Sequence, residues 1–280
     1  MFKPCRIRAK DVVFAWGLDR DAAVSEAKNI FEARDRLRRE RENHVHELIN
    51  NCPEIKDKEV SLACQCAVTA LDSLIVEDKF VEAGLPWFYQ QWSRDEIISS
   101  RAFLLQKNFD FLKKVLFSYF SKITSEGLLP NMVDRDASLL SIDAFGWLAV
   151  RCKELLDVAA KKRSVELVSR REKQQMSDAL QLALSRLLEH RFKSGLIESN
   201  KNEAWMDTEF GGDSRTGFPV EVQALTLALA SVVKRLSGKS DARTSQLGDN
   251  VRKNFFKNKV LFDMAGCVGI RPNVFIAAYV

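Results

Sequence analysis

The chain has 280 residues, of which 46% are hydrophobic and 29% are charged. This composition is typical of a folded globular protein and excludes an intrinsically disordered chain. The net charge is +5, from 43 basic and 38 acidic residues. A surplus this small does not indicate a protein that binds nucleic acid. No apolar run is long enough for a membrane-spanning helix, so we expect no membrane association.

In chain order, the N-terminal region combines a strand with a charged helix. Residues 6–16 contain strand-forming side chains, and residues 21–50 have a helical, strongly charged pattern. A single strand is not stable alone and must pack on another element. We therefore predict a first region, residues 1–56, that consists of a strand and a solvated linker helix.

Beyond this region, from residue 57 to residue 280, the apolar spacing becomes that of buried helices. One helical face is predicted to contain Val60, Cys64, Ala67, Leu71 and Leu74, and Cys64 and Cys66 are interpreted as core residues. Further helices are predicted at about 94–106, 109–124, 137–160, 170–192, 219–237 and 243–257, and a last one begins near residue 271. Convincing strands are absent, so the predicted fold class is all-α.

The connections between these helices alternate in composition. Four of them are rich in Gly, Pro, Trp, Asn, Asp and Arg, namely residues 79–93, 125–136, 193–218 and 258–270. Two helices separate each rich loop from the next, and an antiparallel helix pair returns the chain to the end where it began. We therefore expect the four rich loops to meet at one end of a helical array, where we place the functional site.

The first rich loop, AGLPWFYQQWSRDE, has the residue types that bind sugars. Trp87 and Trp92 offer apolar ring faces, and Arg94 and Asp95 offer charged hydrogen-bonding groups. Part of the motif also has a structural explanation. Ser93 and Glu96 have the spacing of a capping box, which predicts a helix start.

The other rich loops add carboxylates. Asp143 lies among apolar residues and must be hydrogen-bonded, which fits a structural role as well as a functional one. Asp207 follows Trp205 closely, and an acid beside an aromatic surface can have a raised pKa and donate a proton. Glu221 lies in the first turn of a helix, where the helix dipole also favours a carboxylate. The sequence shows no cluster with metal-ligand spacing and no phosphate-binding glycine loop, so we expect neither a metal nor an organic cofactor.

Four motifs in order resemble the glucosidase domain of glycogen-debranching enzymes (amylo-α-1,6-glucosidases). They are AGLPWF…WSRDE, GLLPN…SIDA…W, GLI…AWMD…PVEV.AL and RPN.F, and they extend from about residue 60 to residue 280. The resemblance implies an (α/α)6 barrel of twelve helices with the substrate at the loop-bearing end. It implies a glycoside hydrolase that acts on α-1,6 branch points of glycogen or branched maltodextrin. The six cysteines of a chain this long do not form a disulfide framework by their number alone, so we expect a cytoplasmic protein with reduced thiols.

The resemblance also implies a role for each matching residue. Asp207 would be the general acid, and Arg94 and Asp95 would bind hydroxyl groups of the terminal glucose. Other walls of the sugar site would come from Trp87, Trp205, Asp143 and Glu221. The family reaction is inverting, with one carboxylic acid, one carboxylate base and a water molecule between them.

Against the family pattern, the chain contains about eight of the twelve barrel helices, and residues 1–56 resemble the remnant of a β-sandwich domain. The family's catalytic base, a glutamate, lies in the part that this chain lacks. We therefore expect a complementary C-terminal half, or self-association through uncovered helix faces such as that of Leu225, Leu229, Val232 and Leu236. Two alternatives remain: a non-catalytic glycan-binding or assembly subunit, and an exo-glucosidase similar to glucoamylase or trehalase.

Overall fold

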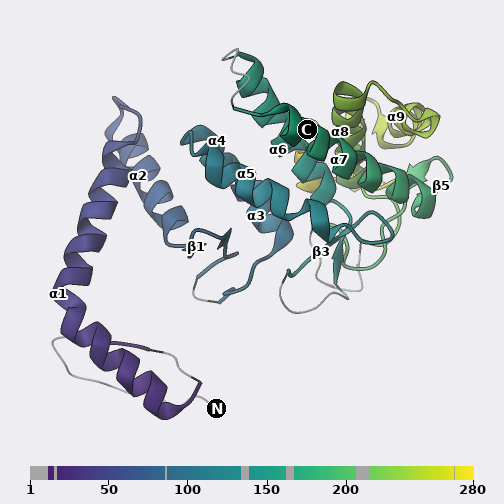
Figure 1. Cartoon of the computed structure of the whole chain (residues 1–280). Coiled ribbons are helices and arrows are strands. Elements are labelled where there is room, and N and C mark those ends of the chain that lie inside the picture. Colours follow the sequence, from purple (N-terminus) through teal and green to yellow (C-terminus); the bar gives the residue numbers. More distant parts are fainter. Residues whose placement is uncertain are drawn as a thin grey trace. The chain divides into compact units, whose positions relative to one another are not determined.

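A computed structural model describes residues 12–15, 18–85, 87–133, 139–161, 167–205, 215–267 and 269–280. The chain divides into two compact units, Met1–Ser73 and Leu74–Val280. Figure 1 shows that the described part is mostly helical, in agreement with the all-α prediction. Among the described residues, no helix combines the length and the apolar character needed to cross a membrane.

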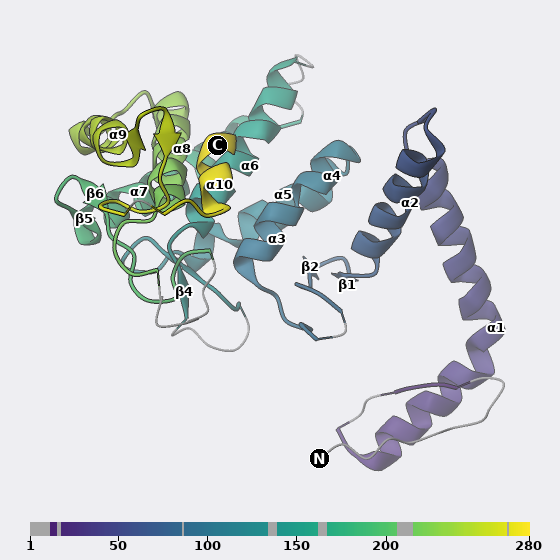
Figure 2. The ribbon, with the colours of Figure 1, turned by 180° about the vertical axis from the view of Figure 1, so that it is seen from behind.

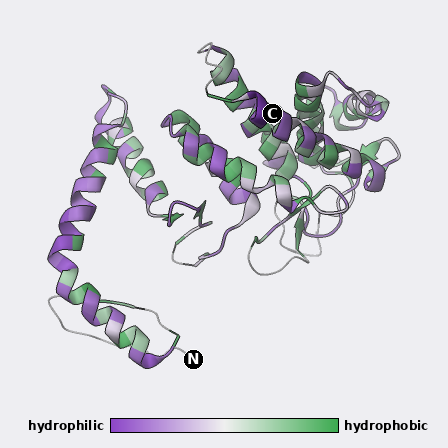
Figure 3. Cartoon of the chain, viewed as in Figure 1, coloured by the Kyte–Doolittle hydropathy of each residue, from purple (hydrophilic) through white to green (hydrophobic). Residues whose placement is uncertain are grey.

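The first unit consists of two helices, α1 (Arg20–Asn50) and α2 (Lys58–Asp72). An aspartate precedes and caps each helix. The side chains of Asp19 and Asp57 accept hydrogen bonds from backbone N–H groups of the first turn. Figure 3 shows that hydrophilic residues predominate in α1, as the sequence predicted. Of the predicted strand at residues 6–16, the structure describes only residues 12–15, and these have no regular secondary structure.

Polar contacts join the two helices of the first unit. The Asp72 carboxylate pairs with Arg41 and lies 2.8 Å from Nε2 of His44. The prediction of a buried face on α2 is wrong, because Val60 is 53% exposed and no residue of α2 is buried. Cys66 is exposed as well, so it is not a core residue.

The second unit contains every helix predicted for it. The helices are α3 (Ser93–Ser99), α4 (Arg101–Leu105), α5 (Phe109–Ser118), the 3-10 turn η1 (Phe120–Lys122), α6 (Ala144–Lys161), α7 (Arg170–His190), α8 (Val220–Ser237), α9 (Ala242–Phe255) and α10 (Asn273–Tyr279). Helix α6 begins at residue 144 rather than near residue 137, because residues 140–141 form a strand instead.

Four short β-hairpins, which the sequence analysis did not predict, lie in or next to the rich loops. They pair β1 (Ile75–Val76) with β2 (Phe80–Val81), β3 (Leu129–Pro130) with β4 (Leu140–Ser141), β5 (Phe192–Lys193) with β6 (Leu196–Ile197), and β7 (Phe256–Lys257) with β8 (Val260–Leu261). Three of them turn through two residues with positive φ, as type I′ turns require. These pairs are Glu77 and Asp78, Ser194 and Gly195, and Asn258 and Lys259.

The core of the second unit is centred on α6, α7 and α8. Gly146 of α6 permits a close helix contact, since a Cβ atom at this position would lie 2.3 Å from Cβ of Leu225 on α8. Leu148, Leu155 and Leu180 fill the space between these helices and are completely buried. This close packing fixes the positions of the helices, and the site is built near their N-terminal ends.

The predicted uncovered face of α8 is not present. Leu225, Leu229 and Val232 are each 1% exposed, and Leu236 is half-buried. The reason is that α8 contacts α6, α7, α9 and α10, so its apolar side chains are covered. Figure 2 shows α10 beside α8 in the view from behind. These residues therefore give no support to self-association through this face.

Candidate functional site

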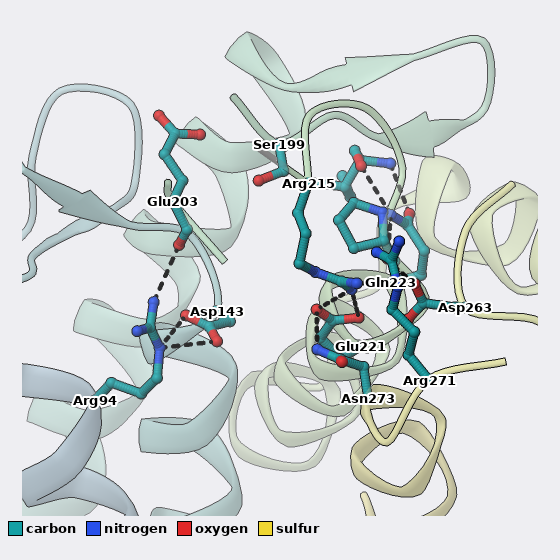
Figure 4. A network of polar contacts seen from close by, with 12 residues as sticks. Arg94, Asp143, Ser199, Glu203, Arg215, Glu221, Gln223, Asp263, Arg271 and Asn273 are labelled. Carbon is teal, nitrogen blue, oxygen red and sulfur yellow. Dashed lines mark hydrogen bonds and ion pairs between the residues drawn. The ribbon is translucent and has the colours of Figure 1, made fainter. Parts of the chain in front are cut away.

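Buried polar side chains connect the ends of the first three rich loops (Figure 4). Nε of Arg94 donates to both carboxylate oxygens of Asp143, at 2.9 and 3.0 Å. Its Nη2 donates to Oγ of Ser141 at 3.0 Å and to the backbone carbonyl of Glu203 at 3.3 Å. The Arg94 guanidinium, which comes just after the first loop, therefore contacts two further segments. One is the segment directly before α6, and the other is the third loop.

A second arginine connects the third rich loop to the fourth. Nη2 of Arg215 donates to both carboxylate oxygens of Glu221, at 2.6 and 2.8 Å, and its Nη1 donates to Asp263 at 2.8 Å. Asn273 donates to Glu221 at 3.0 Å, and Nη1 of Arg271 lies 3.4 Å from Asp263. These ion pairs, together with the hydrogen bond from Arg94 to the Glu203 carbonyl, confirm the prediction that the four rich loops meet.

The fold delivers these side chains from recurring positions. Asp143, Ser199 and Asp263 each lie two residues after the second strand of a hairpin. Arg94 and Glu221 are the second residues of α3 and α8. The site is therefore built where each hairpin ends and where the next helix begins.

The network buries charge and compensates it. Arg94, Asp143, Arg215, Glu221 and Asp263 are each at most 4% exposed, and ionised groups in such surroundings must be paired. Burial raises the pKa of the Glu221 carboxyl, and the charge of Arg215 opposes that rise. Among the described residues, no group of three or more His, Cys, Asp and Glu side chains could hold a metal ion.

The third rich loop is anchored by backbone and side-chain bonds. Ser199 and Gly217 exchange two backbone hydrogen bonds, of 2.7 and 2.9 Å. The two terminal nitrogens of Arg191 donate to the Glu203 carboxylate, at 3.1 and 2.7 Å. The backbone carbonyl of Glu203 also accepts a 2.9 Å bond from the N–H group of Ile142. Glu203 is therefore held through both its side chain and its main chain.

A pocket of about 210 Å³ lies beside the buried network. Asp95 and Trp205 share this pocket with Leu74, Val81, Glu82, Ala83, Ile98 and Ser99. Asp95 is exposed, and Trp205 is 38% exposed. The volume is below the roughly 300–1,000 Å³ of pockets for drug-sized ligands. A carboxylate and an aromatic ring in so small a space suit a single sugar ring.

Glu96 has a different role from the one that the sequence predicted. The Ser93 side chain makes no capping hydrogen bond, so the predicted capping box is absent. Instead, the Glu96 carboxylate accepts hydrogen bonds from the Val81 N–H group at 2.8 Å, from the Gln91 amide at 2.6 Å and from the Tyr119 hydroxyl. Burial of Glu96 raises its pKa, while these bonds favour the ionised form. The side chain thus connects both arms of the first rich loop to α3.

The remaining predicted residues lie in different surroundings. Trp87 is 80% exposed and is not part of the pocket wall. Asp207 lies outside the described residues. Glu203, Arg215 and Asp263 were not predicted, although they are central to the network. For Asp263, a signal was present in the sequence, because an apolar residue, Phe262, directly precedes it, as Ile142 precedes Asp143.

Comparison with known proteins gives the family. The family model described as amylo-alpha-1,6-glucosidase matches residues 68–280, a segment that contains the pocket and the whole buried network. A comparison with curated proteins found no match. The family points to glycoside hydrolases of the debranching type, with an α-glucan as substrate. The chain belongs to the amylo-alpha-1,6-glucosidase family.

Proposed function

We propose that this chain carries the terminal-glucose pocket and the general acid of an α-1,6-glucosidase that acts on branch points of glycogen and branched maltodextrin. The observation that carries this proposal is the pocket that Asp95 shares with Trp205. Its size and its lining suit one glucose unit, and Trp205 lies two residues before Asp207 in the AWMD motif. The family match supports the same class of substrate.

In the proposed reaction, the carboxylic acid of Asp207 protonates the glycosidic oxygen as the bond to C1 of the glucose breaks. A carboxylate base removes a proton from a water molecule, whose oxygen attacks C1 from the opposite face, so the configuration inverts. Inverting enzymes hold the two carboxyl groups roughly 6.5–9.5 Å apart. Asp95 accepts hydrogen bonds from sugar hydroxyl groups, and the Trp205 ring covers the C–H face of the sugar.

The buried residues hold the segments that lead to this pocket. Arg94 holds the carbonyl group of Glu203, two residues before Trp205, and the same guanidinium holds Asp143. Glu221 is tied to Arg215, at the other end of the third rich loop. In this proposal, the three predicted wall residues Arg94, Asp143 and Glu221 act by fixing the loops against which the sugar rests.

We place the catalytic base outside the described network. The side chains of Asp143 and Glu221 are 0% exposed and are held by arginines, whereas a base must face the attacking water. This supports a complementary C-terminal segment that completes an (α/α)6 barrel and supplies the glutamate. In that arrangement, the isolated chain binds α-glucan weakly and does not hydrolyse it at an enzymatic rate.

The test compares binding, turnover and mass in solution. The purified chain is titrated with branched dextrin, and glucose release is measured from branched dextrin, linear maltooligosaccharide and trehalose. Asp95→Ala is expected to abolish binding and to leave the helical circular dichroism unchanged. Asp249→Ala, a change of an exposed carboxylate on α9, serves as the control. In the complete assembly, Asp207→Asn is expected to abolish glucose release.

Each alternative has its own outcome. Normal binding by Asp95→Ala would contradict the pocket assignment, and loss of its fold would make Asp95 structural. A monomer with ordinary turnover would show that a carboxylate within residues 1–280 is the base. Hydrolysis of trehalose would favour an exo-glucosidase of another specificity. Binding without hydrolysis in the complete assembly would favour a glycan-binding subunit.

A further inference from the structure

Two cysteines of the first unit lie together although they belong to different segments of the helix pair. Cys52 follows the end of α1 by two residues, and Cys64 lies in the second turn of α2. Their side chains are hydrogen-bonded to each other, and both thiols are partly exposed. The two sulfur atoms are therefore in contact and remain accessible to a small reagent.

The surrounding backbone holds each cysteine in place. The Cys52 thiol donates to the Leu48 carbonyl at 3.5 Å, and the Cys52 N–H group donates to the Ile49 carbonyl at 3.0 Å. Cys64 lies within α2, whose first turn is capped by the Asp57 side chain. A disulfide forms only where the backbone positions of two cysteines already allow the short S–S bond, and two thiols in contact satisfy that condition.

The helix pair that carries these cysteines has little else to hold it together. No residue of α1 or of α2 is buried, so burial of apolar surface contributes little to their packing. The Asp72 carboxylate pairs with Arg41 and lies 2.8 Å from Nε2 of His44, and both of these partners are exposed. Exposed ion pairs contribute little to stability. One covalent link would therefore supply a large share of the stability of this helix pair.

We propose that Cys52 and Cys64 form a reversible disulfide that ties the end of α1 to α2 under oxidising conditions. One thiolate attacks a disulfide oxidant, oxidised glutathione, and releases one molecule of glutathione. The second protein thiolate attacks the mixed disulfide and releases another. The two cysteines together lose two electrons and two protons, which leave as the thiols of the two glutathione molecules. Disulfides in reducing compartments are usually transient, as a reversible bond of this kind is.

The chemistry of the pair sets its reactivity. Burial and the adjacent Cys64 thiol raise the pKa of the Cys52 thiol, and only the thiolate attacks a disulfide. Oxidation should therefore become faster as the pH rises. Cys66 follows Cys64 by two residues on α2, so their side chains point about 200° apart around the helix and cannot pair with each other.

The test maps the bridge and measures its effect on the helix pair. The purified, fully reduced chain is incubated with oxidised glutathione, and its peptides are analysed by mass spectrometry without reduction. We expect a bridge between Cys52 and Cys64 that is absent from Cys64→Ser and present in the matched control Cys66→Ser, which removes an exposed thiol. Hydrogen exchange of the α1 and α2 amides should be slower in the oxidised chain by up to about 100-fold, as closure of a loop of this length predicts.

The inference does not depend on the proposed function, because both cysteines precede residues 68–280, the segment that matches the family. Separate glutathione adducts without a bridge would overturn it, and so would a bridge that uses Cys66 in place of Cys64. A bridge between Cys52 and Cys64 that leaves the exchange of α1 and α2 unchanged would show that the disulfide does not lock the helix pair. Each of these results leaves the sugar-binding experiments with Asp95→Ala unaffected.

Discussion

Removal of the Arg215 side chain is the most direct test of the buried network. This guanidinium makes two hydrogen bonds to Glu221 and one to Asp263, and all three side chains are at most 4% exposed. Loss of one partner of a buried ion pair costs about 3–5 kcal/mol. Because Asn273 still binds Glu221 and Arg271 still lies near Asp263, we expect Arg215→Ala to cost about 3 kcal/mol, the lower end of that range. Total stabilities of domains are about 5–15 kcal/mol.

The cost of Arg215→Ala should depend on pH. Burial already raises the pKa of Glu221, and the variant removes the positive charge that opposes this rise. A carboxyl group whose folded-state pKa is raised contributes stability that is complete below its unfolded-state pKa, which is about 4.3. That contribution is lost as the pH rises through the folded-state pKa. The deficit of the variant should therefore be largest near neutral pH and should shrink as the pH falls toward 5.

Urea unfolding followed by circular dichroism measures this deficit at pH 7.5 and at pH 5. Arg252→Ala is the matched control, because it removes a guanidinium that pairs with Asp249 while both side chains are exposed. Exposed pairs of this kind contribute little to stability. Equal effects of Arg215→Ala and Arg252→Ala would refute the reasoning, and so would a deficit that grows at acid pH. Arg215→Lys should lie between the wild type and Arg215→Ala, because lysine keeps the charge and loses the forked geometry.

Other changes test the packing and the cysteines. Gly146→Ala should destabilise the protein by about 1–3 kcal/mol, because the new Cβ would lie 2.8 Å from the Leu225 carbonyl oxygen, which cannot move aside. Gly248→Ala, at a helical site whose nearest new contact is 3.9 Å away, should stabilise by about 0.5–1 kcal/mol in the same urea assay, and a loss of stability there would contradict the open space beside this position of α9. Burial raises the pKa of the Cys152 thiol to about 12, so a thiol reagent should label exposed Cys66 in the native protein and Cys152 only after unfolding.

The features that sequence predicted well were repetitive ones. The apolar residues of a helix recur with a period of 3.6 residues over several turns, so a helix can be predicted without any tertiary information. The convergence of the rich loops followed from the return of each helix pair. The contacts of Arg94 with Asp143 and with the Glu203 carbonyl, and of Arg215 with Asp263, confirm it. These predictions depended on chain direction and composition alone.

The features that sequence missed depend on single long-range contacts. The hairpin strands have two residues each, too few for a visible alternation. The backbone oxygen of Glu203 lies 109 residues from Arg94 along the chain, and no local pattern indicates such a bond. Glu96 was misread because its spacing from Ser93 is that of a capping box. Burial turned its carboxylate toward Val81 and Gln91 instead.

Arg94 and Asp95 are neighbours in one predicted sugar-binding motif, yet their side chains have different roles. Successive residues of an α-helix point about 100° apart, so the two side chains cannot face the same way. At the start of α3, Arg94 is 4% exposed and lies in the ion-pair network, whereas Asp95 is exposed and lines the pocket. The arginine holds Asp143 and the Glu203 carbonyl, and so it supports the chain that leads to Trp205, which lines the same pocket as Asp95. A change at Arg94 should therefore displace Trp205, while a change at Asp95 should remove a carboxylate that lines the pocket.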